Sequence, residues 1–155
     1  MTDAQSPATR RAAAFRALRE AHANEMAEDY VELIGDLITE TGEARVADLA
    51  LHMGVTQPTV AKVVARLKGL GLVESRRYRS LFLTAAGARM AEISRARHQV
   101  VVDFLKALGV SDQTAAIDSE GLEHHVSEET LAALLRTTKR LTRGKAAARL
   151  AGSGS

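Results

Sequence analysis

Apolar residues recur at helical spacing along most of the chain, and this pattern predicts a mostly α-helical fold. A long first helix is expected over residues 8–40, where one stripe is apolar. The stripe consists of Met26, Tyr30, Leu33, Ile34, Leu37 and Ile38. Shorter helices are expected over residues 45–52 and 57–70. Thr56 stands at the N-cap of the latter helix and Pro58 in its first turn, where a missing N–H costs little.

After residue 71 the pattern changes from helical to extended. Two short extended runs within residues 72–83 flank a basic turn, which is typical of a β-hairpin. Further helices are expected over residues 84–108 and 111–124 and from residue 127 onward. Helix, glycine-containing turn, helix and hairpin in this order predict a winged helix-turn-helix followed by a helical domain.

The expected organisation therefore has four parts. Residues 1–20 form an N-terminal extension, 21–83 the winged helix-turn-helix DNA-binding domain, 84–142 a helical metal-binding and dimerisation domain, and 143–155 a flexible tail.

Composition narrows the chemistry. The 155 residues include no cysteine, which excludes disulfides, zinc fingers and iron–sulfur clusters. Any bound metal must therefore be held by oxygen and imidazole nitrogen. The chain has no signal-peptide pattern and no apolar run long enough to cross a membrane, so a cytoplasmic protein is expected.

The charges are segregated although the formal net charge is only +2. In a winged helix-turn-helix the start of the second helix enters the major groove, and basic residues along it and the wing lie near phosphates. The residues expected to contact DNA are Gln57, Pro58, Thr59, Lys62, Arg66, Arg76, Arg77 and Arg79. The alternative is a helical hairpin whose charged outer face is merely solvated.

Ligand-type side chains occur in three places. Asp29 and Glu32 share a helix face at spacing i, i+3, and so do Glu120, Glu123 and His124 at i, i+3, i+4, while His98 lies in an apolar stretch. Each group alone has an ordinary alternative, as solvated acids or a core histidine. A fold that joined them would bury several carboxylates, which is costly unless they are paired or bind a cation. Such a site suits Mn(II) or Fe(II) better than Zn(II) or Cu(I).

Four runs of sequence resemble the manganese transport regulators of the diphtheria toxin repressor family. They are EDYVE at 28–32, TQPTVAK at 56–62, RH at 97–98 and EGLEHH at 120–125. The resemblance covers roughly residues 21–135, and the last run is the most specific. The first twenty residues extend beyond shorter family members, and the chain ends before the SH3-like domain of iron-sensing relatives.

The resemblance implies a homodimer that binds double-stranded operator DNA through its N-terminal domain and dimerises through its C-terminal helices. It also implies one or two Mn(II) ions per subunit, held by Asp29, Glu32, His98, Glu120, Glu123 and His124. Iron-sensing relatives carry Met and Cys in place of Asp29 and Glu120, so the carboxylates here favour Mn(II), with Fe(II) as the alternative. His125 is not a ligand in the family pattern and is interpreted as structural.

The expected function is a Mn(II)-responsive transcriptional repressor of manganese uptake genes, and not an enzyme. Metal binding is expected to fix the angle and spacing of the two recognition helices of the dimer. A carboxylate-bridged di-iron oxidase would need a Glu-x-x-His pair on each of two helices, and the chain has none. A winged-helix sensor of an organic ligand would leave the grouped carboxylates unexplained.

Overall fold

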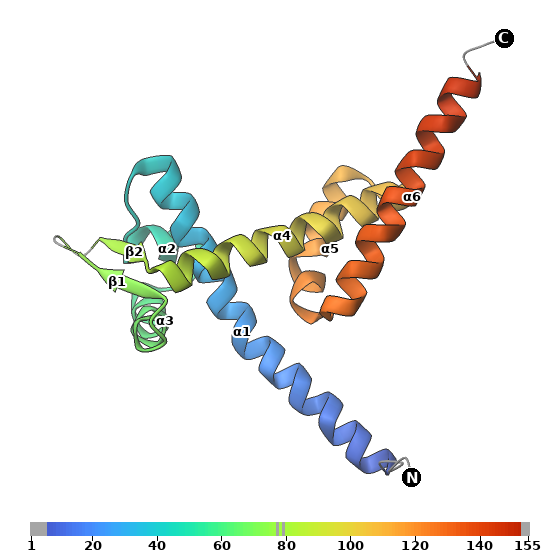
Figure 1. Ribbon diagram of the computed structural model, residues 1–155. Helices are drawn as coiled ribbons and strands as arrows, with labels where there is room; N and C mark the ends of the chain where they lie inside the picture. The colour runs from blue at the N-terminus through green and yellow to red at the C-terminus, as the bar shows by residue number, and fades with distance from the viewer. Residues whose placement is uncertain (1–5, 77, 79, 153–155) are drawn as a thin grey trace. The chain divides into compact units, whose positions relative to one another are not determined.

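The computed structural model describes residues 6–76, 78 and 80–152, apart from the side chains of residues 23 and 146–152. The described residues form six helices and one two-stranded sheet (Figure 1). In chain order these are α1 (Pro7–Thr41), α2 (Val46–Met53), α3 (Gln57–Gly69), β1 (Val73–Ser75), β2 (Leu81–Leu83), α4 (Ala85–Leu108), α5 (Asp112–His125) and α6 (Glu128–Gly152). The predicted mostly helical fold with one hairpin is confirmed.

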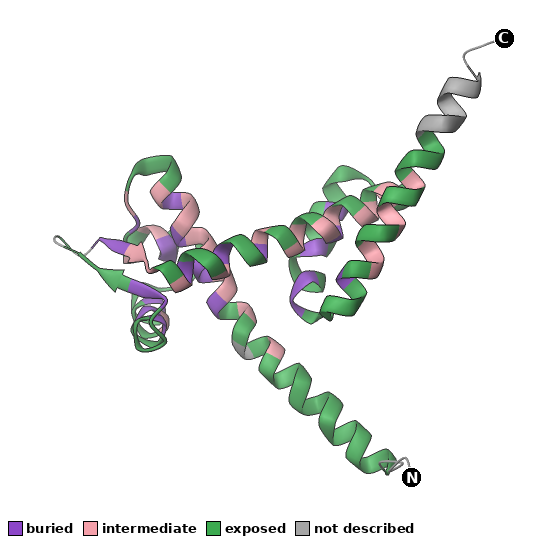
Figure 2. Ribbon diagram, in the orientation of Figure 1, coloured by how far each residue is buried: buried purple, intermediate pink, exposed green. Residues whose placement is uncertain are grey.

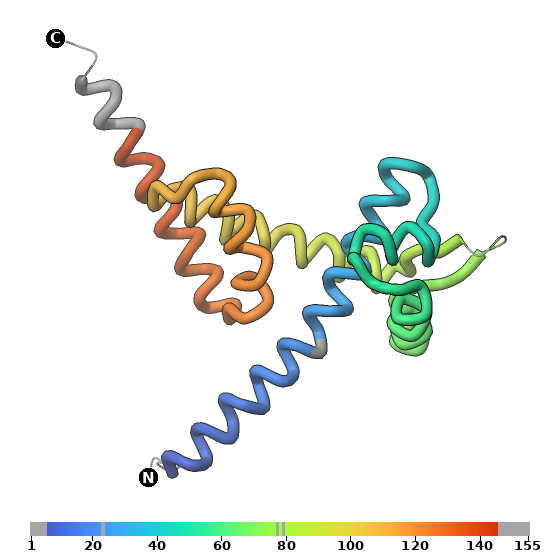
Figure 3. The backbone as a smooth tube through the Cα atoms, turned by 180° about the vertical axis from the view of Figure 1, so that it is seen from behind, coloured from blue at the N-terminus to red at the C-terminus, as the bar shows by residue number. Residues whose placement is uncertain are grey.

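The chain divides into two compact units, residues 1–94 and 95–155, and each is described by itself below. The first unit holds α1 to α3, the sheet and the start of α4. The second holds the rest of α4 with α5 and α6. The division falls inside α4, which is one continuous helix along the smooth backbone trace of Figure 3.

The core of the first unit is built where α1, α2, α3 and the sheet meet (Figure 2). Ile34, Leu49, Val60, Leu67 and Leu81 are among its most deeply buried side chains, each at most 2% exposed. Burying an aliphatic side chain of this size contributes about 1.5–3 kcal/mol, so these contacts fix the helices against one another.

The expected apolar stripe of α1 packs on this core, with one exception. Tyr30, Ile34 and Leu37 are buried, whereas Met26 is 46% exposed. The N-terminal part of α1, before Ala21, is exposed throughout its described residues, as Figure 2 shows in green. Only the C-terminal half of α1 therefore contributes to the core of the first unit.

The turn between α2 and α3 follows from its local sequence. Gly54 ends α2 in the left-handed conformation, with φ 65°, where a residue without a Cβ is favoured. Thr56 then caps α3, since its hydroxyl accepts a hydrogen bond from the Thr59 N–H at 3.4 Å. The predicted cap and the predicted turn are both confirmed.

The hairpin is attached through the start of β2 to the loop between α1 and α2. Strands β1 and β2 are antiparallel, and the Leu81 N–H donates to the Ala44 carbonyl at 2.8 Å. Beside this bond the Glu43 carboxylate accepts hydrogen bonds from Arg45 at 2.9 Å and from the Ser80 hydroxyl at 2.8 Å. Both bonds, that from Arg45 most strongly, hold the pKa of Glu43 below its ordinary value.

The C-terminal helix differs from the expectation of a flexible tail from residue 143. Helix α6 continues to Gly152, and the Lys145 ammonium donates to the Ala107 carbonyl at the end of α4 at 2.8 Å. Residues 145–151 (KAAARLA) are mostly strong helix formers, which outweigh the single Gly144 before them.

Across the described residues, no helix combines the length and the apolar character needed to cross a bilayer.

The start of α4 lies unusually close to the main chain between α3 and β1. The Thr84 hydroxyl donates to the Gly71 carbonyl at 2.6 Å and accepts from the Gly87 N–H at 3.1 Å. A Cβ atom on Gly87 would lie 2.0 Å from the Leu72 carbonyl oxygen, which is main chain and cannot rotate away. Only glycine fits this position without a backbone shift.

Gly87→Ala is therefore expected to destabilise the first unit by roughly 1–3 kcal/mol or more, because the added methyl group forces the backbone apart. The measurement is urea unfolding of the metal-free protein followed by circular dichroism. Gly69→Ala is the matched control, since its Cβ would meet no atom within 4 Å on an exposed face of α3. The control should be neutral or up to about 1 kcal/mol more stable. Equal stability of the two variants would contradict the close approach.

Candidate metal centre and nucleic-acid surface

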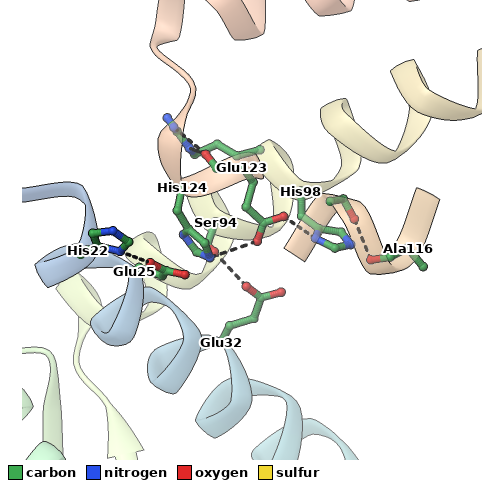
Figure 4. Close-up of polar contacts among 10 residues, drawn as sticks. His22, Glu25, Glu32, Ser94, His98, Ala116, Glu123 and His124 are labelled. Carbon is green, nitrogen blue, oxygen red and sulfur yellow. Dashed lines mark hydrogen bonds and ion pairs between the residues drawn. The ribbon is translucent and has the colours of Figure 1, made fainter. Parts of the chain in front are cut away.

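The second unit brings His98 of α4 against the acidic face of α5. The Ser111 hydroxyl caps α5 by accepting from the Thr114 N–H at 3.3 Å, and the helix then carries Glu120 and Glu123 on one face. The His98 Nδ1–H donates to the Glu123 carboxylate (Figure 4). The Glu123 side chain is only 4% exposed and that of His98 27%. A histidine separated from Glu123 by 25 residues thus becomes its direct partner.

Three side chains of this unit form a candidate cation site. One ligand-type atom each from His98, Glu120 and Glu123 lies within 4.8 Å of the others. One imidazole nitrogen and two carboxylate oxygens are donors that suit Mn(II) or Fe(II), and the chain has no thiolate to offer instead. The residues present therefore fit a hard or borderline divalent cation.

His124 lies on the other side of Glu123. Its Nε2 is 3.4 Å from the second carboxylate oxygen of Glu123, and its side chain is 1% exposed (Figure 4). Burial raises the pKa of the Glu123 carboxyl, against the opposing effects of His98 and His124 and with a smaller contribution from the negative charge of Glu120. Ionised Glu123 is thus energetically costly in this unit, and a cation would offset that cost.

Asp29 and Glu32 lie on α1 in the first unit. The Glu32 carboxylate accepts a hydrogen bond from the Ser94 hydroxyl at 2.9 Å, and Ser94 is 2% exposed (Figure 4). Asp29 lines a cavity of about 440 Å³ together with Val55 and Thr59 of the helix-turn-helix. One of the two acids therefore contacts α4, and the other borders the DNA-binding motif.

The start of α3 presents an exposed polar face. Its buried side consists of Val60, Val64 and Leu67. Its exposed side carries Gln57, Pro58, Thr59, Lys62 and Arg66. A groove of about 550 Å³ runs along this face and is bordered by Arg45, Gln57, Pro58 and Tyr78. The residues of α3 that the sequence analysis predicted to contact DNA are therefore accessible to a binding partner.

The wing only partly follows the sequence interpretation. Arg76 is exposed, but it pairs with Glu74 at 3.0 Å and its guanidinium lies 4.4 Å from the centre of the Phe82 ring. Arg77 and Arg79 lie outside the described residues. Tyr78 between them is 84% exposed with φ 64°, and the sequence analysis did not select it.

The sequence analysis gave no role to two further residues that contact the candidate ligands. Ser94 contacts Glu32, and Arg97 donates hydrogen bonds to the main chain of Glu123. The only signal in the sequence was the position of Arg97, directly before a candidate ligand. A serine in a helix and an arginine beside a histidine carry no pattern that predicts these contacts.

Family models match both parts of the chain. Residues 22–81 match the N-terminal DNA-binding domain of the iron-dependent repressors, and residues 84–144 match their metal-binding and dimerisation domain. Together the matches cover most of the chain.

Individual relatives agree with these matches. The chain is 56% identical to the transcriptional regulator MntR of Escherichia coli O6:H1 over 81% of either chain. It is 54% identical to that of Salmonella typhimurium over 81% of this chain and 80% of the relative.

Solved structures give the same fold. The structure of a manganese-dependent transcriptional repressor in complex with manganese is 28% identical, with a TM-score of 0.65. That alignment covers 73% of this chain and 52% of the solved one, so this chain spans about half the length of that protein.

The burial of Glu123 leads to a prediction that tests whether its carboxylate binds a metal or mainly stabilises the fold. Glu123→Gln keeps the shape of the side chain but removes the buried charge, so the metal-free variant should be at least as stable as the unchanged protein at pH 7.5. The same variant should lose the rise in melting temperature that a bound divalent cation produces. The measurement is thermal unfolding with chelator and with added metal. A clear loss of metal-free stability would show that the carboxylate mainly supports the fold.

Proposed function

Since the chain belongs to the iron-dependent repressor family of metal-responsive transcriptional repressors, we propose that it is a Mn(II)-responsive repressor of manganese uptake genes. It binds double-stranded operator DNA as a metal-activated homodimer. Residues 21–83 serve as the DNA-binding domain and residues 84–142 as the metal-binding and dimerisation domain. The observation that carries the proposal is the grouping of His98, Glu120 and Glu123, which all offer nitrogen or oxygen donors. In the sequence this group follows a winged helix-turn-helix.

The proposed ligands of Mn(II) are the six residues selected from the sequence. They are Asp29, Glu32, His98, Glu120, Glu123 and His124. His98, Glu120 and Glu123 are supported by the short distances between their ligand atoms, and His124 by its burial beside Glu123. Asp29 and Glu32 rest on the family resemblance. Six such side chains are enough for one or two ions per subunit.

The choice of Mn(II) is supported by the relatives. Those most similar in sequence carry the name MntR, and a structural relative is described in complex with manganese. Fe(II) is the second candidate, because it accepts the same imidazole and carboxylate donors. Mn(II) is bound more weakly than Fe(II) or Zn(II) by most sites, so selection depends on coordination number and geometry rather than on affinity.

The homodimer is supported by the apolar surface of the second unit. Ile117, Leu122 and Leu135 are 65%, 45% and 42% exposed on α5 and α6. Where such side chains form one patch, the surface is typical of those that pack against another protein. A second copy of the chain would cover them and place two recognition helices on one DNA duplex.

The proposed activation acts through order rather than through a new DNA contact. Without a cation, mutual repulsion between the carboxylates opposes their assembly, whereas a bound Mn(II) holds them together and restricts the two recognition helices to a narrower range of positions. Operator half-sites about 34 Å apart, one turn of DNA, can then be bound simultaneously at a smaller entropic cost.

Gln57 and Arg66 should affect DNA binding in different ways. Gln57→Ala removes a side chain able to bond to base edges, so it should cost roughly 1–3 kcal/mol on the operator and reduce the preference over unrelated DNA. Arg66→Ala removes a phosphate contact, so it should weaken binding to all sequences and lower the salt dependence by about one counterion. The measurement is fluorescence anisotropy at several salt concentrations. An unchanged ratio of specific to nonspecific affinity in Gln57→Ala would show that α3 does not contact the bases.

Metal activation is tested with labelled DNA from a promoter of a manganese transporter gene. Mn(II) should strengthen binding strongly and Zn(II) weakly, with Fe(II) added under anaerobic conditions as the alternative and chelator as the baseline. His98→Ala should remove the response to Mn(II) while leaving the weak binding seen with chelator. Equal activation by Zn(II) and Mn(II), or a full response in His98→Ala, would argue against this metal centre.

A further inference from the structure

Arg97 makes a set of contacts that the proposed function leaves unassigned. Its Nε and Nη2 atoms donate to the Glu123 carbonyl at 3.2 and 2.9 Å, and Nη2 also donates to the Val126 carbonyl at 2.7 Å. Its Nη1 pairs with the Glu128 carboxylate at the start of α6. The Arg97 side chain is 18% exposed. One guanidinium group thus connects α4 to the end of α5 and the beginning of α6.

The end of α5 needs such a donor. The last carbonyl groups of any helix lack partners within that helix. Helices α1 and α2 end in left-handed Gly42 and Gly54, whose N–H groups bond back to the helix. Helix α5 instead ends at Val126 in an extended conformation, with φ −90° and ψ 139°. Arg97 supplies the hydrogen bonds from outside and brings a positive charge to the negative end of the helix dipole.

Two consecutive residues of α4 hold Glu123 by two different parts. His98 binds the side-chain carboxylate of Glu123, and Arg97 binds its main-chain carbonyl. His124 is the next residue, so the same hydrogen bonds also fix the main-chain position from which its side chain extends. Arg97 and His98 lie next to each other on the same helix, α4. The main chain at Glu123 therefore cannot shift relative to His98 without breaking the Arg97 hydrogen bonds.

We propose that Arg97 is a positioning residue of the metal centre, which holds the carboxyl end of α5 so that Glu123 and His124 stay beside His98. The hydrogen bonds described for Arg97 go to main-chain carbonyl groups and to Glu128, so Arg97 acts on Glu123 through its main chain. The proposal rests on the proposed function, because it assigns a role toward the same metal. It requires the planar fork of arginine, since two carbonyl groups at different angles are bonded at once.

The sign of the effect distinguishes positioning from electrostatics. Removal of a positive charge near a cation site should by Coulomb's law strengthen cation binding. Loss of positioning should weaken it, typically by roughly 10–100-fold for residues that orient metal ligands. Arg97→Ala is therefore expected to bind Mn(II) more weakly although the site has become less positive.

The experiment titrates the full chain with Mn(II) alone and follows free and bound Mn(II) by electron paramagnetic resonance. Arg97→Ala should lose roughly 10–100-fold in affinity, and Arg97→Lys, which keeps the charge but not the fork, should recover only part of it. Glu128→Gln should bind like the unchanged protein, because the carbonyl contacts remain. Arg89→Ala is the control, an exposed arginine of the same helix. The line shape of bound Mn(II), which reports ligand symmetry, should change only in the Arg97 variants.

The outcomes that overturn the proposal are distinct. Unchanged or tighter Mn(II) binding in Arg97→Ala, or full recovery in Arg97→Lys, would exclude positioning by the fork. An equal loss in Glu128→Gln would assign the effect to the ion pair instead. If circular dichroism shows that Arg97→Ala does not fold, Arg97→Lys decides alone, and a wild-type affinity there overturns the proposal. His98→Ala tests the centre itself: undiminished binding there would reject the metal site, whatever Arg97 does.

Discussion

The second unit depends on how it accommodates one carboxylate that is almost removed from water. An ionised carboxyl group in such a place costs several kcal/mol unless charges and hydrogen bonds surround it. Helices α4 and α5 meet this requirement with an imidazole on each side of Glu123 and a guanidinium group on its main chain. These groups reduce the cost of the Glu123 charge only in part, because burial still raises the pKa of its carboxyl group. A divalent cation would therefore bind there favourably.

The first unit is organised by a different principle. Its recognition helix is held by an ordinary aliphatic core, and its polar face is left exposed. The buried side chains of that core are apolar, so none of them is a metal ligand. Under the proposed function, DNA contacts would come from the exposed face of α3, and control would come from charged ligand groups whose balance a cation changes.

Much of the fold could be predicted from the sequence because its signals are local. Helical periodicity, the cap at Thr56 and the two extended runs around a basic turn act over a few residues, and the i, i+3, i+4 spacing already placed Glu120, Glu123 and His124 on one face. Contacts across long separations had no such signal. The bond between Ser80 and Glu43 spans 37 residues, and that between Ser94 and Glu32 spans 62. Arg97 donates to main-chain carbonyl groups, which every residue has. Residue types alone therefore could not predict these hydrogen bonds. The sequence analysis assigned residues 143–155 to a flexible tail, whereas α6 continues to Gly152.

The hairpin described above is held next to its turn by the Ala44–Leu81 bridge and by the main-chain hydrogen bond from the Arg76 N–H to the Ser80 carbonyl at 2.9 Å. Its direction is therefore decided before the chain reaches the tip. Substitutions at the tip change what the wing offers to DNA without altering the path of the strands that support it. Related regulators could therefore differ in the charge of this tip while they keep the same folded body, so the tip is a part of the first unit where sequence change should have little effect on stability.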